Sequence, residues 1–272
     1  MDRFPALLSI VLLFQFATAA VAQTPAKGHN TVRLVSYNIR NGKGLDNKVD
    51  QERIARIITA SGADFVALQE LDSCTQRYNK DFVLQKLAML TGMEAIYAPA
   101  IPFQGGKYGI GLLSKQKAMS WKYYPLPGSE EERVLLVAEF CDCYILNTHF
   151  SLTEADQLLS LDTIFAVAAQ LNKPCFLMGD LNATPGSEVI KRLSKHFTCL
   201  TDTAAHTFPA DKPDITIDYI FTPMPRSAFT LKGSYVIDEP QASDHRPVGV
   251  DIHNRVKIVK QRLVGKDVPE TQ

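Results

Sequence analysis

The sequence predicts an α+β fold in which two packed β-sheets carry helices on their outer faces. About ten short strand-like segments alternate with three or four helical segments along the 272 residues. Several consecutive strand-like segments have no helix between them, which predicts hairpins and therefore mixed, mainly antiparallel sheets. Two such sheets packed together, with the helices outside, would bury the apolar faces of these elements.

The first part of the chain is predicted to alternate strands with helices. Residues 31–37 are rich in β-branched and aromatic types, which is typical of a strand. Isoleucines then recur at helical spacing, and Gly62 is expected to end that helix. A short apolar run at 65–68 predicts a buried strand, and residues 82–90 predict a second helix that ends at Gly92.

The rest of the chain is predicted to contain mostly strands and one long helix. Thr153 can cap the N-terminus of this helix, which runs to about Leu171 and carries acidic residues in its first turn. Cys141 and Cys143 flank a predicted hairpin turn. The remaining strands are predicted at residues 108–113, 134–140, 144–148, 175–178, 218–221, 234–237 and 248–252.

Residues 1–22 are typical of a secretory signal peptide. Arg3 and the free amino terminus precede an apolar run at 6–16, and small residues lead up to Ala22, where we expect cleavage. The run is shorter than the roughly 20 residues of a membrane-spanning helix, although an uncleaved N-terminal anchor is the alternative. With no later transmembrane segment predicted, we expect a secreted or periplasmic protein whose residues 23–272 form a single domain.

Composition excludes several classes of protein. The chain is 46% hydrophobic, which is too apolar for a disordered protein. Lys and Arg number 29, as do Asp and Glu, whereas proteins that hold nucleic acid by bulk charge are usually basic. The five cysteines are too few for a disulfide-stapled miniprotein, and their odd number means that they cannot all pair within the chain.

Polar side chains follow the predicted strands at the points where the strands end. A strand end can present a carboxylate, amide or imidazole at one rim of a sheet, and loops on a rigid scaffold often carry binding and catalytic groups. Each residue alone is common in a turn, at the surface or in a core, but together they predict one shared site. They are Asn38, Glu70, His149, Asp180, Asn182, Asp218, Asp244 and His245.

Six short motifs around these residues resemble the endonuclease/exonuclease/phosphatase superfamily, the DNase I-like fold, and in particular its secreted bacterial branch. In the family's order and over about residues 32–250, they are SYNI, QE, THF, GDLNATP, IDYIF and SDHRP. The resemblance implies a four-layer αββα sandwich of two mixed, mainly antiparallel sheets, with one site at the sheet rim. It also implies divalent-metal hydrolysis of a phosphate ester.

Phosphate-ester hydrolysis needs a hard cation, a base for water and donors for the added negative charge. The predicted ligands for Mg²⁺ or Mn²⁺ are Glu70, Asn38 and Asp244. The predicted catalytic residues are Asp180 as the base, His245 held protonated by Asp218, and His149 and Asn182 as phosphate donors. Asn38, Asn182, Arg133 and Tyr108 are predicted to bind the phosphate.

Some nucleases of the family carry a carboxylate that pairs with the first histidine, and no such residue can be placed in this sequence. The charge state of His149 is therefore left open. Overall the residues predict a secreted phosphohydrolase, foremost a monomeric phosphodiesterase that uses metal-activated water in line attack. Its substrate is nucleic acid or a phospholipid or inositol-phosphate head group.

The alternative is a non-catalytic module that binds a phosphate ligand on the same fold, since a fold does not fix a function. An inactive relative is expected to lose the metal-binding acid or the base. Glu70, Asp180, Asp244 and His245 are all present, which favours the enzyme.

Overall fold

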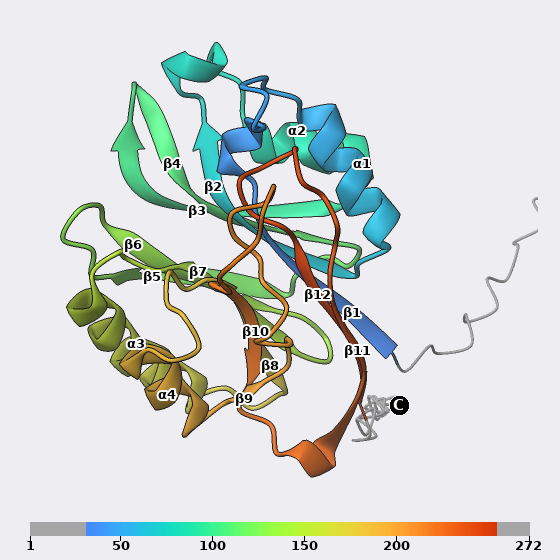
Figure 1. Cartoon of the computed structure of the whole chain (residues 1–272), viewed down its shortest axis with the longest axis vertical. Coiled ribbons are helices and arrows are strands. Elements are labelled where there is room, and N and C mark those ends of the chain that lie inside the picture. The colour runs from blue at the N-terminus through green and yellow to red at the C-terminus, as the bar shows by residue number, and fades with distance from the viewer. Residues whose placement is uncertain (1–30, 255–272) are drawn as a thin grey trace, which may run out of the picture.

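The computed structural model describes residues 31–254, which form two six-stranded sheets packed face to face between pairs of helices (Figure 1). The strand orders are β11-β12-β1-β2-β4-β3 and β5-β6-β7-β8-β10-β9. Each sheet contains one parallel pair, β1–β2 or β7–β8, among antiparallel neighbours. The predicted four-layer α+β sandwich of mixed, mainly antiparallel sheets is confirmed. The predicted signal peptide lies outside the described residues.

The bounds of the elements are as follows. The first sheet contains β1 (Thr31–Asn38), β2 (Phe65–Ser73), β3 (Glu94–Phe103), β4 (Gly106–Ser114), β11 (Phe229–Val236) and β12 (Val248–Asn254). The second contains β5 (Ser120–Leu126), β6 (Arg133–Glu139), β7 (Tyr144–His149), β8 (Cys175–Asp180), β9 (Thr198–Cys199) and β10 (Asp218–Thr222). The α-helices are α1 (Gln51–Ser61), α2 (Val83–Thr91), α3 (Glu154–Ala168) and α4 (Glu188–Ser194).

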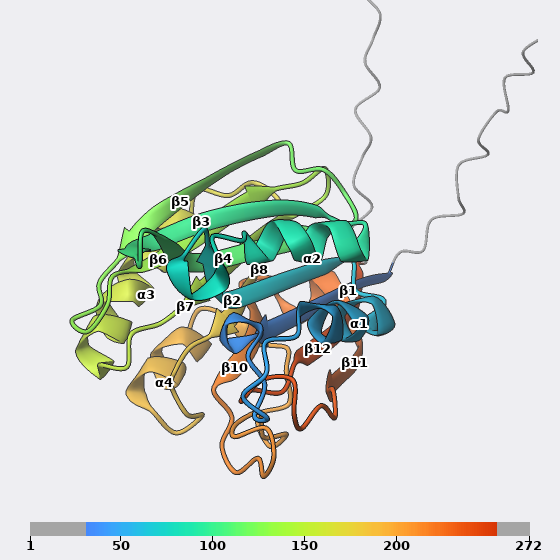
Figure 2. The ribbon, with the colours of Figure 1, turned by 90° about the horizontal axis from the view of Figure 1, so that it is seen from above.

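Figure 2 shows α1 and α2 on one side of the sheets and α3 and α4 on the other. Three apolar clusters join these layers, one between the sheets and one under each pair of helices. Because successive side chains of a strand point to opposite faces, Leu34 enters the cluster between the sheets while Val35 packs under α1 and α2. Phe65 and Phe140 meet edge to face between the sheets, with ring centroids 4.6 Å apart. No helix within residues 31–254 has the length and apolar character needed to cross a membrane.

The predicted helix ends follow from local chemistry. The side chain of Asp50 caps α1 by accepting from the backbone amide of Arg53 at 2.7 Å. Both α1 and α2 end at the predicted glycines, Gly62 and Gly92, which adopt left-handed conformations that suit glycine. The long helix begins after Thr153 as predicted, although the Thr153 side chain makes no capping hydrogen bond.

Four elements escape the sequence pattern, namely β3, β5, α4 and the two-residue β9. Pro99 and Pro102 lie inside β3, and proline is normally evidence against a strand interior because it cannot donate to the ladder. Both β3 and β5 are edge strands, where that missing donor is tolerated. Strand β5 is largely exposed on both faces and therefore shows no alternation of apolar and polar residues.

All five cysteines are free in the structure. Cys141 and Cys143 flank the tight turn between β6 and β7, as the sequence predicts. Cys143 and Cys175 are buried, and burial raises the pKa of each thiol to about 12. These two thiols therefore act as small apolar side chains at neutral pH.

Candidate active site

The sheet topology brings the polar strand ends to a single rim. In the first sheet β1 and β2 run parallel, and the start of β12 lies beside the end of β1 through the Ser36–Val248 pair. In the second sheet Asp180 is paired with His149 on one side and with Asp218 on the other. Residues more than a hundred positions apart thus meet where the two sheets face each other.

Asn38 joins the two halves of this site. Its buried amide nitrogen donates to Glu70 Oε1 at 3.1 Å and to Asp180 Oδ2 at 3.0 Å. The first carboxylate belongs to the first sheet and the second to the second sheet, so one side chain bridges both. The expectation that Glu70 and Asp180 converge on a common point is therefore met.

The amide orientation of Asn38 is fixed by its other end. Its Oδ1 accepts from the backbone amide of Arg40 at 3.1 Å, so a flipped amide would set two donors against each other. The Asn38 oxygen thus has one lone pair engaged by Arg40, and the amide hydrogens face the two carboxylates, so the role of Asn38 as a metal ligand stays a prediction. The geometry supports the other predicted role, in which Asn38 donates to phosphate.

Glu70 reaches the rim because β2 is irregular at that point. The pairing of β2 with β4 shifts register between Leu68 and Leu71, and Glu70 has a left-handed backbone with φ of 59°. This conformation costs of order 1–3 kcal/mol in a residue other than glycine and is concentrated at functional sites. Burial raises the pKa of Glu70, the hydrogen bond from Asn38 opposes the shift, and the negative charges of Asp244 and Asp180 add to it.

Asp180 is held by the turn that follows β8. Its Oδ1 accepts from the backbone amide of Asn182 at 2.9 Å, which leaves Oδ2 facing the rim. The side-chain amide of Asn182 donates to the Phe150 carbonyl at 3.0 Å, so one of its hydrogens is committed to the backbone. Gly179 precedes Asp180 where any Cβ would lie 2.0 Å from the Thr148 carbonyl oxygen. The absence of a side chain there lets β7 and β8 pack closely and sets His149 beside Asp180.

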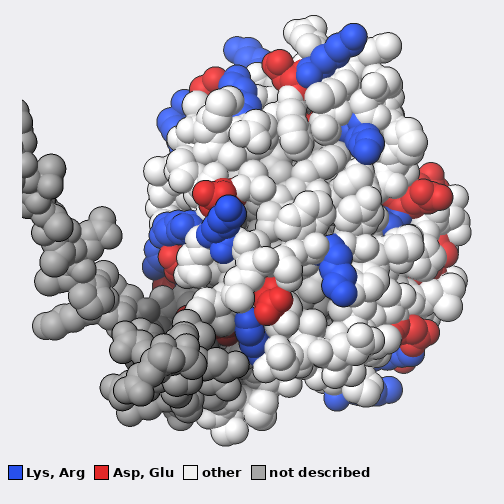
Figure 3. All heavy atoms as spheres, turned by 180° about the vertical axis from the view of Figure 1, so that it is seen from behind, with Lys and Arg blue, Asp and Glu red and all other residues white. Residues whose placement is uncertain are grey.

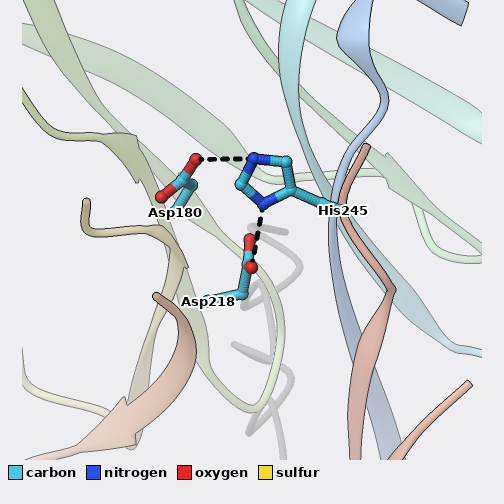
Figure 4. A group of neighbouring side chains, drawn as sticks. All are labelled: Asp180, Asp218 and His245. Atoms are coloured by element: carbon cyan, nitrogen blue, oxygen red, sulfur yellow. Dashed lines mark hydrogen bonds and ion pairs between the residues drawn. The ribbon is translucent and has the colours of Figure 1, made fainter. Parts of the chain in front are cut away.

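His245 forms a relay with two aspartates, through a hydrogen bond to one and an ion pair with the other (Figure 4). Its Nδ1 lies 3.0 Å from Asp218 Oδ2, and its Nε2 lies 3.6 Å from Asp180 Oδ2. Burial alone would lower the pKa of His245, but the charges of Asp218 and Asp180 outweigh burial and raise the pKa to about 10. The ring is therefore positively charged at neutral pH, as the sequence predicts for a histidine held by Asp218.

His149 approaches the same carboxylate from the opposite side with a different environment. Its Nε2 lies 3.5 Å from Asp180 Oδ2, while its Nδ1 faces Nη1 of Arg133 at 3.3 Å. Burial, reinforced by the positive charge of Arg133, lowers the pKa of His149 to about 4 against the pull of Asp180. His149, whose charge state the sequence leaves open, is therefore neutral at pH 7.

The remaining predicted residues lie around this centre. Tyr108 is next to Glu70, and burial together with that negative charge raises the pKa of its hydroxyl. Tyr108, Arg133 and His149 line one small notch at the rim. Asp244 lies near enough to Glu70 for its charge to raise the pKa of that carboxyl, and Arg40 Nε pairs with Asp244 Oδ2 at 3.3 Å.

The donor set suits a hard divalent cation at Glu70 and Asp244. Glu70 is surrounded by like charges, and a buried carboxylate needs a partner of opposite charge. Mg²⁺ and Mn²⁺ prefer such oxygen ligands. A second group, Asp180, Asp218 and His245, also has ligand atoms within 4.8 Å of one another. There His245 Nδ1 already lies 3.0 Å from Asp218 Oδ2, and the positively charged ring would repel a cation, so we assign this group as a relay rather than a cation site.

Several residues of the site have no signal in the sequence. Thr207 donates to Asp218 Oδ2 at 2.6 Å from a loop eleven positions earlier, outside every motif. Arg40 adopts a left-handed backbone with φ of 45° just after Asn38. Glu130 pairs with Arg133 at 3.0 Å in a loop that reads as an ordinary acidic turn. A tight-turn geometry or a long-range contact cannot be deduced from residue type alone.

Comparison with known proteins agrees with this geometry. The model of the Endonuclease/Exonuclease/phosphatase family matches residues 35–245, so the chain belongs to that family. An endonuclease/exonuclease/phosphatase from Beutenbergia cavernae is 22% identical with a TM-score of 0.68, over 82% of this chain and 72% of that one. An endonuclease/exonuclease/phosphatase from Bacteroides vulgatus is 20% identical with a TM-score of 0.68, over 82% of this chain and 99% of that one.

A third similar structure is a mannosyl-6-phosphatase from Bacteroides thetaiotaomicron, 17% identical with a TM-score of 0.63 over 81% of this chain and 99% of that one. No curated protein sequence matches the chain. At these identities the solved structures establish the shared fold.

Proposed function

We propose that the chain is a divalent-metal-dependent phosphohydrolase that cleaves phosphodiesters by in-line attack of water. The observation that carries this proposal is the set of three N–H donors that converge on one carboxylate oxygen. Asn38, His149 and His245 each place a nitrogen within 3.6 Å of Asp180 Oδ2. Donors that now face Asp180 can equally face the oxygens of a phosphate held beside it, as hydrolysis requires.

In this mechanism Asp180 takes a proton from the attacking water. Asp180 Oδ1 accepts from the backbone amide of Asn182, which fixes the orientation of the carboxylate and leaves Oδ2 facing the rim. The cationic ring of His245 stabilises the extra negative charge on a non-bridging oxygen, and Asp218 keeps that ring aligned. His149 and Asn38 donate from the other sides. No step requires a covalent bond between enzyme and substrate.

Glu70 and Asp244 would hold the metal. Members of the family generally depend on a divalent metal, and a bound Mg²⁺ or Mn²⁺ would neutralise charge on the phosphoryl oxygens. Around it, the carboxylates of Asp180, Glu130 and Glu131 lie beside the cations Arg133 and His245, so both signs of charge meet at the position proposed for the phosphate ester.

The substrate within this class is a nucleic acid or a phospholipid or inositol-phosphate head group. Formal net charge is zero, and basic and acidic side chains are interspersed over the face drawn in Figure 3. Such a surface gives long nucleic acid little bulk attraction. The relative from B. thetaiotaomicron is named as a phosphatase of a mannosyl-6-phosphate, so small phosphorylated compounds belong in any substrate panel.

The direct test is a panel assay of the protein from Gln23 onward with Mg²⁺, Mn²⁺ or Ca²⁺. The substrates are bis-p-nitrophenyl phosphate, p-nitrophenyl phosphate, plasmid DNA, RNA, sphingomyelin and inositol phosphates. We expect metal-dependent cleavage of at least one diester, lost in Asp180→Asn and kept in Asp142→Asn, whose carboxylate is exposed in the β6–β7 turn. Binding without hydrolysis would favour the non-catalytic module, and absence of both would refute the proposal.

We also propose that the protein is exported, because residues 1–22 have the pattern of a cleavable signal peptide. When the full-length chain is expressed, the protein recovered outside the cytosol should begin at Gln23, as measured by mass spectrometry of the N-terminal peptide. A protein that keeps Met1 and stays in the cytosol would contradict export.

A further inference from the structure

Arg133 is enclosed by protein groups rather than open to a ligand. Its side chain is only 8% exposed. Nη2 pairs with Glu130 at 3.0 Å, and Nη1 lies 3.2 Å from Glu131 and 3.3 Å from Nδ1 of His149. Its Nε is buried as well. A guanidinium held in this way has little freedom to turn toward a phosphate.

The contact with His149 has only one chemically consistent form. A guanidinium carries N–H donors and no acceptor. Nδ1 of His149 must therefore accept from Arg133, so it carries no hydrogen. The proton of the neutral ring is then on Nε2, the nitrogen that lies 3.5 Å from Asp180 Oδ2. The tautomer follows from which partner is able to donate, and it directs the single N–H of the ring at the reaction centre.

We propose that Arg133 is a positioning residue that holds His149 as the neutral Nε2–H tautomer, directed at Asp180 and at the phosphate bound beside it. The proposal rests on the function proposed above for the nature of the reaction, but the tautomer itself is a property of the chain. It replaces the predicted role of Arg133 as a direct phosphate ligand. A neutral ring with one N–H can donate a hydrogen bond but has no spare proton to transfer, so His149 is a hydrogen-bond donor and not a general acid.

The surroundings of Arg133 are built to keep this arrangement. Glu130 accepts from Arg133 and also from the Ser151 hydroxyl at 2.7 Å and the Leu152 amide at 2.8 Å. One carboxylate thus anchors both the guanidinium and the loop that follows His149. Arg133 is the first residue of β6 and His149 the last of β7, so both lie at the same end of this antiparallel pair, just beyond the Leu135–Thr148 pair.

The charged groups that face His149 come from four parts of the chain. Asp180 lies at the end of β8, His245 precedes β12, Arg133 begins β6 and Glu130 lies in the loop before it. The two cations, Arg133 and His245, disfavour a positive charge on the ring, whereas Asp180 and Glu130 favour it. Removal of Arg133 therefore removes both the donor to Nδ1 and one of the charges that keep the ring neutral.

The test compares two substitutions of similar length. Arg133→Met removes every donor, whereas Arg133→Lys keeps a positively charged N–H donor on a side chain one atom shorter. Arg192→Met is the matched control, because Arg192 pairs with Asp162 on the surface of the helical layer, away from the site. The first readout is the ¹⁵N NMR spectrum of the histidine rings, with His149 assigned from a His149→Asn sample, and it needs no substrate.

We expect wild type and Arg133→Lys to show His149 protonated at Nε2 only, and Arg133→Met to show a mixture of tautomers. Turnover of bis-p-nitrophenyl phosphate in Arg133→Met should fall about 10–100-fold in kcat, the range seen when a group that orients an active residue is lost. KM should change little, and Arg133→Lys should recover most of kcat. Arg192→Met should match wild type in both measurements.

A phosphate ligand would behave differently. If Arg133→Met raises KM with kcat and the His149 ring signals unchanged, Arg133 binds substrate directly and the proposal is wrong. An Nδ1-protonated His149 in wild type would also overturn it. If wild type hydrolyses nothing while the ring signals behave as expected, the proposed function fails and the positioning role stands, so the two failures are distinguishable.

Discussion

The substitution Asp218→Asn tests whether His245 must be charged for activity. Asp218 Oδ2 lies 3.0 Å from His245 Nδ1, and its charge is the largest influence that raises the pKa of that ring. The difference between an ordinary histidine pKa of 6.5 and about 10 corresponds to roughly 5 kcal/mol in favour of the charged ring. Asparagine keeps the shape of Asp218 but removes the charge, so the pKa of His245 should fall to its ordinary value or below it.

The size of the effect depends on pH in a calculable way. With a pKa of about 6.5, only about one ring in thirty is charged at pH 8, whereas nearly all rings are charged at pH 5.5. Activity of Asp218→Asn should therefore be at least about 30-fold below wild type at pH 8, and this ratio should shrink as pH falls. In wild type His245 should stay charged until the pH approaches about 10, so activity should not fall through loss of this charge below that pH.

The assay is kcat/KM for bis-p-nitrophenyl phosphate from pH 5.5 to 10 in saturating metal. Asp214→Asn is the control, because Asp214 is an exposed residue on the same segment as Asp218. A ratio of wild type to Asp218→Asn that stays constant across this range would show that the charge of His245 is not what Asp218 supplies. The reasoning from the relay in Figure 4 would then be refuted.

Three further predictions concern the same site. Asp180→Asn should lower turnover by at least about 10²-fold through loss of the base, and near-normal turnover in a folded variant would exclude that role. EDTA should abolish activity and Mg²⁺ or Mn²⁺ should restore it, with Glu70→Gln raising the metal concentration for half-maximal activity at least ~10-fold in a titration. Because the pKa of His149 is lowered to about 4, the unfolded chain binds the extra proton between pH 6.5 and 4, so folding stability falls as pH falls through that window. Urea unfolding should show that His149→Gln loses less stability over the window than wild type does, and equal losses would place the lowered pKa in doubt.

Much of the fold and the membership of the site could be predicted from the sequence because both depend on local signals. The ends of α1 and α2 at Gly62 and Gly92 follow from a backbone conformation that glycine adopts without cost. The residues of the rim stand at strand ends, and parallel or antiparallel pairing of short strands brings such ends together. Glu70 and Asp180 could therefore be expected to converge.

The parts that could not be predicted depend on long-range geometry. Strand β3 could not be predicted because it contains two prolines, which normally argue against a strand. An edge strand tolerates them, but the edge position is not visible in the sequence. Strand β2 continues past its predicted end at Leu68, beyond an irregularity in its pairing with β4. The residue types around Glu70 do not indicate this irregularity or the left-handed backbone of Glu70. The direction of the Asn38 amide is set by the backbone of Arg40, a contact that exists only once the chain turns after β1.

The charges of the two histidines show the same distinction most clearly. His149 and His245 lie 3.5 and 3.6 Å from the same oxygen of Asp180, yet one is neutral and the other is cationic. Both are buried histidines within a family motif, so the difference comes from the group that faces the second ring nitrogen. The carboxylate of Asp218 makes the His245 ring a cation, whereas burial, reinforced by the guanidinium of Arg133, keeps the His149 ring neutral. Environments that push two pKa values apart are what let a single site hold a charged and an uncharged donor at one pH. The different roles of the two histidines at this rim therefore depend on their partners, which lie on β10 and β6. Asp218 belongs to the IDYIF motif and could be predicted, whereas Arg133 lies outside the six motifs.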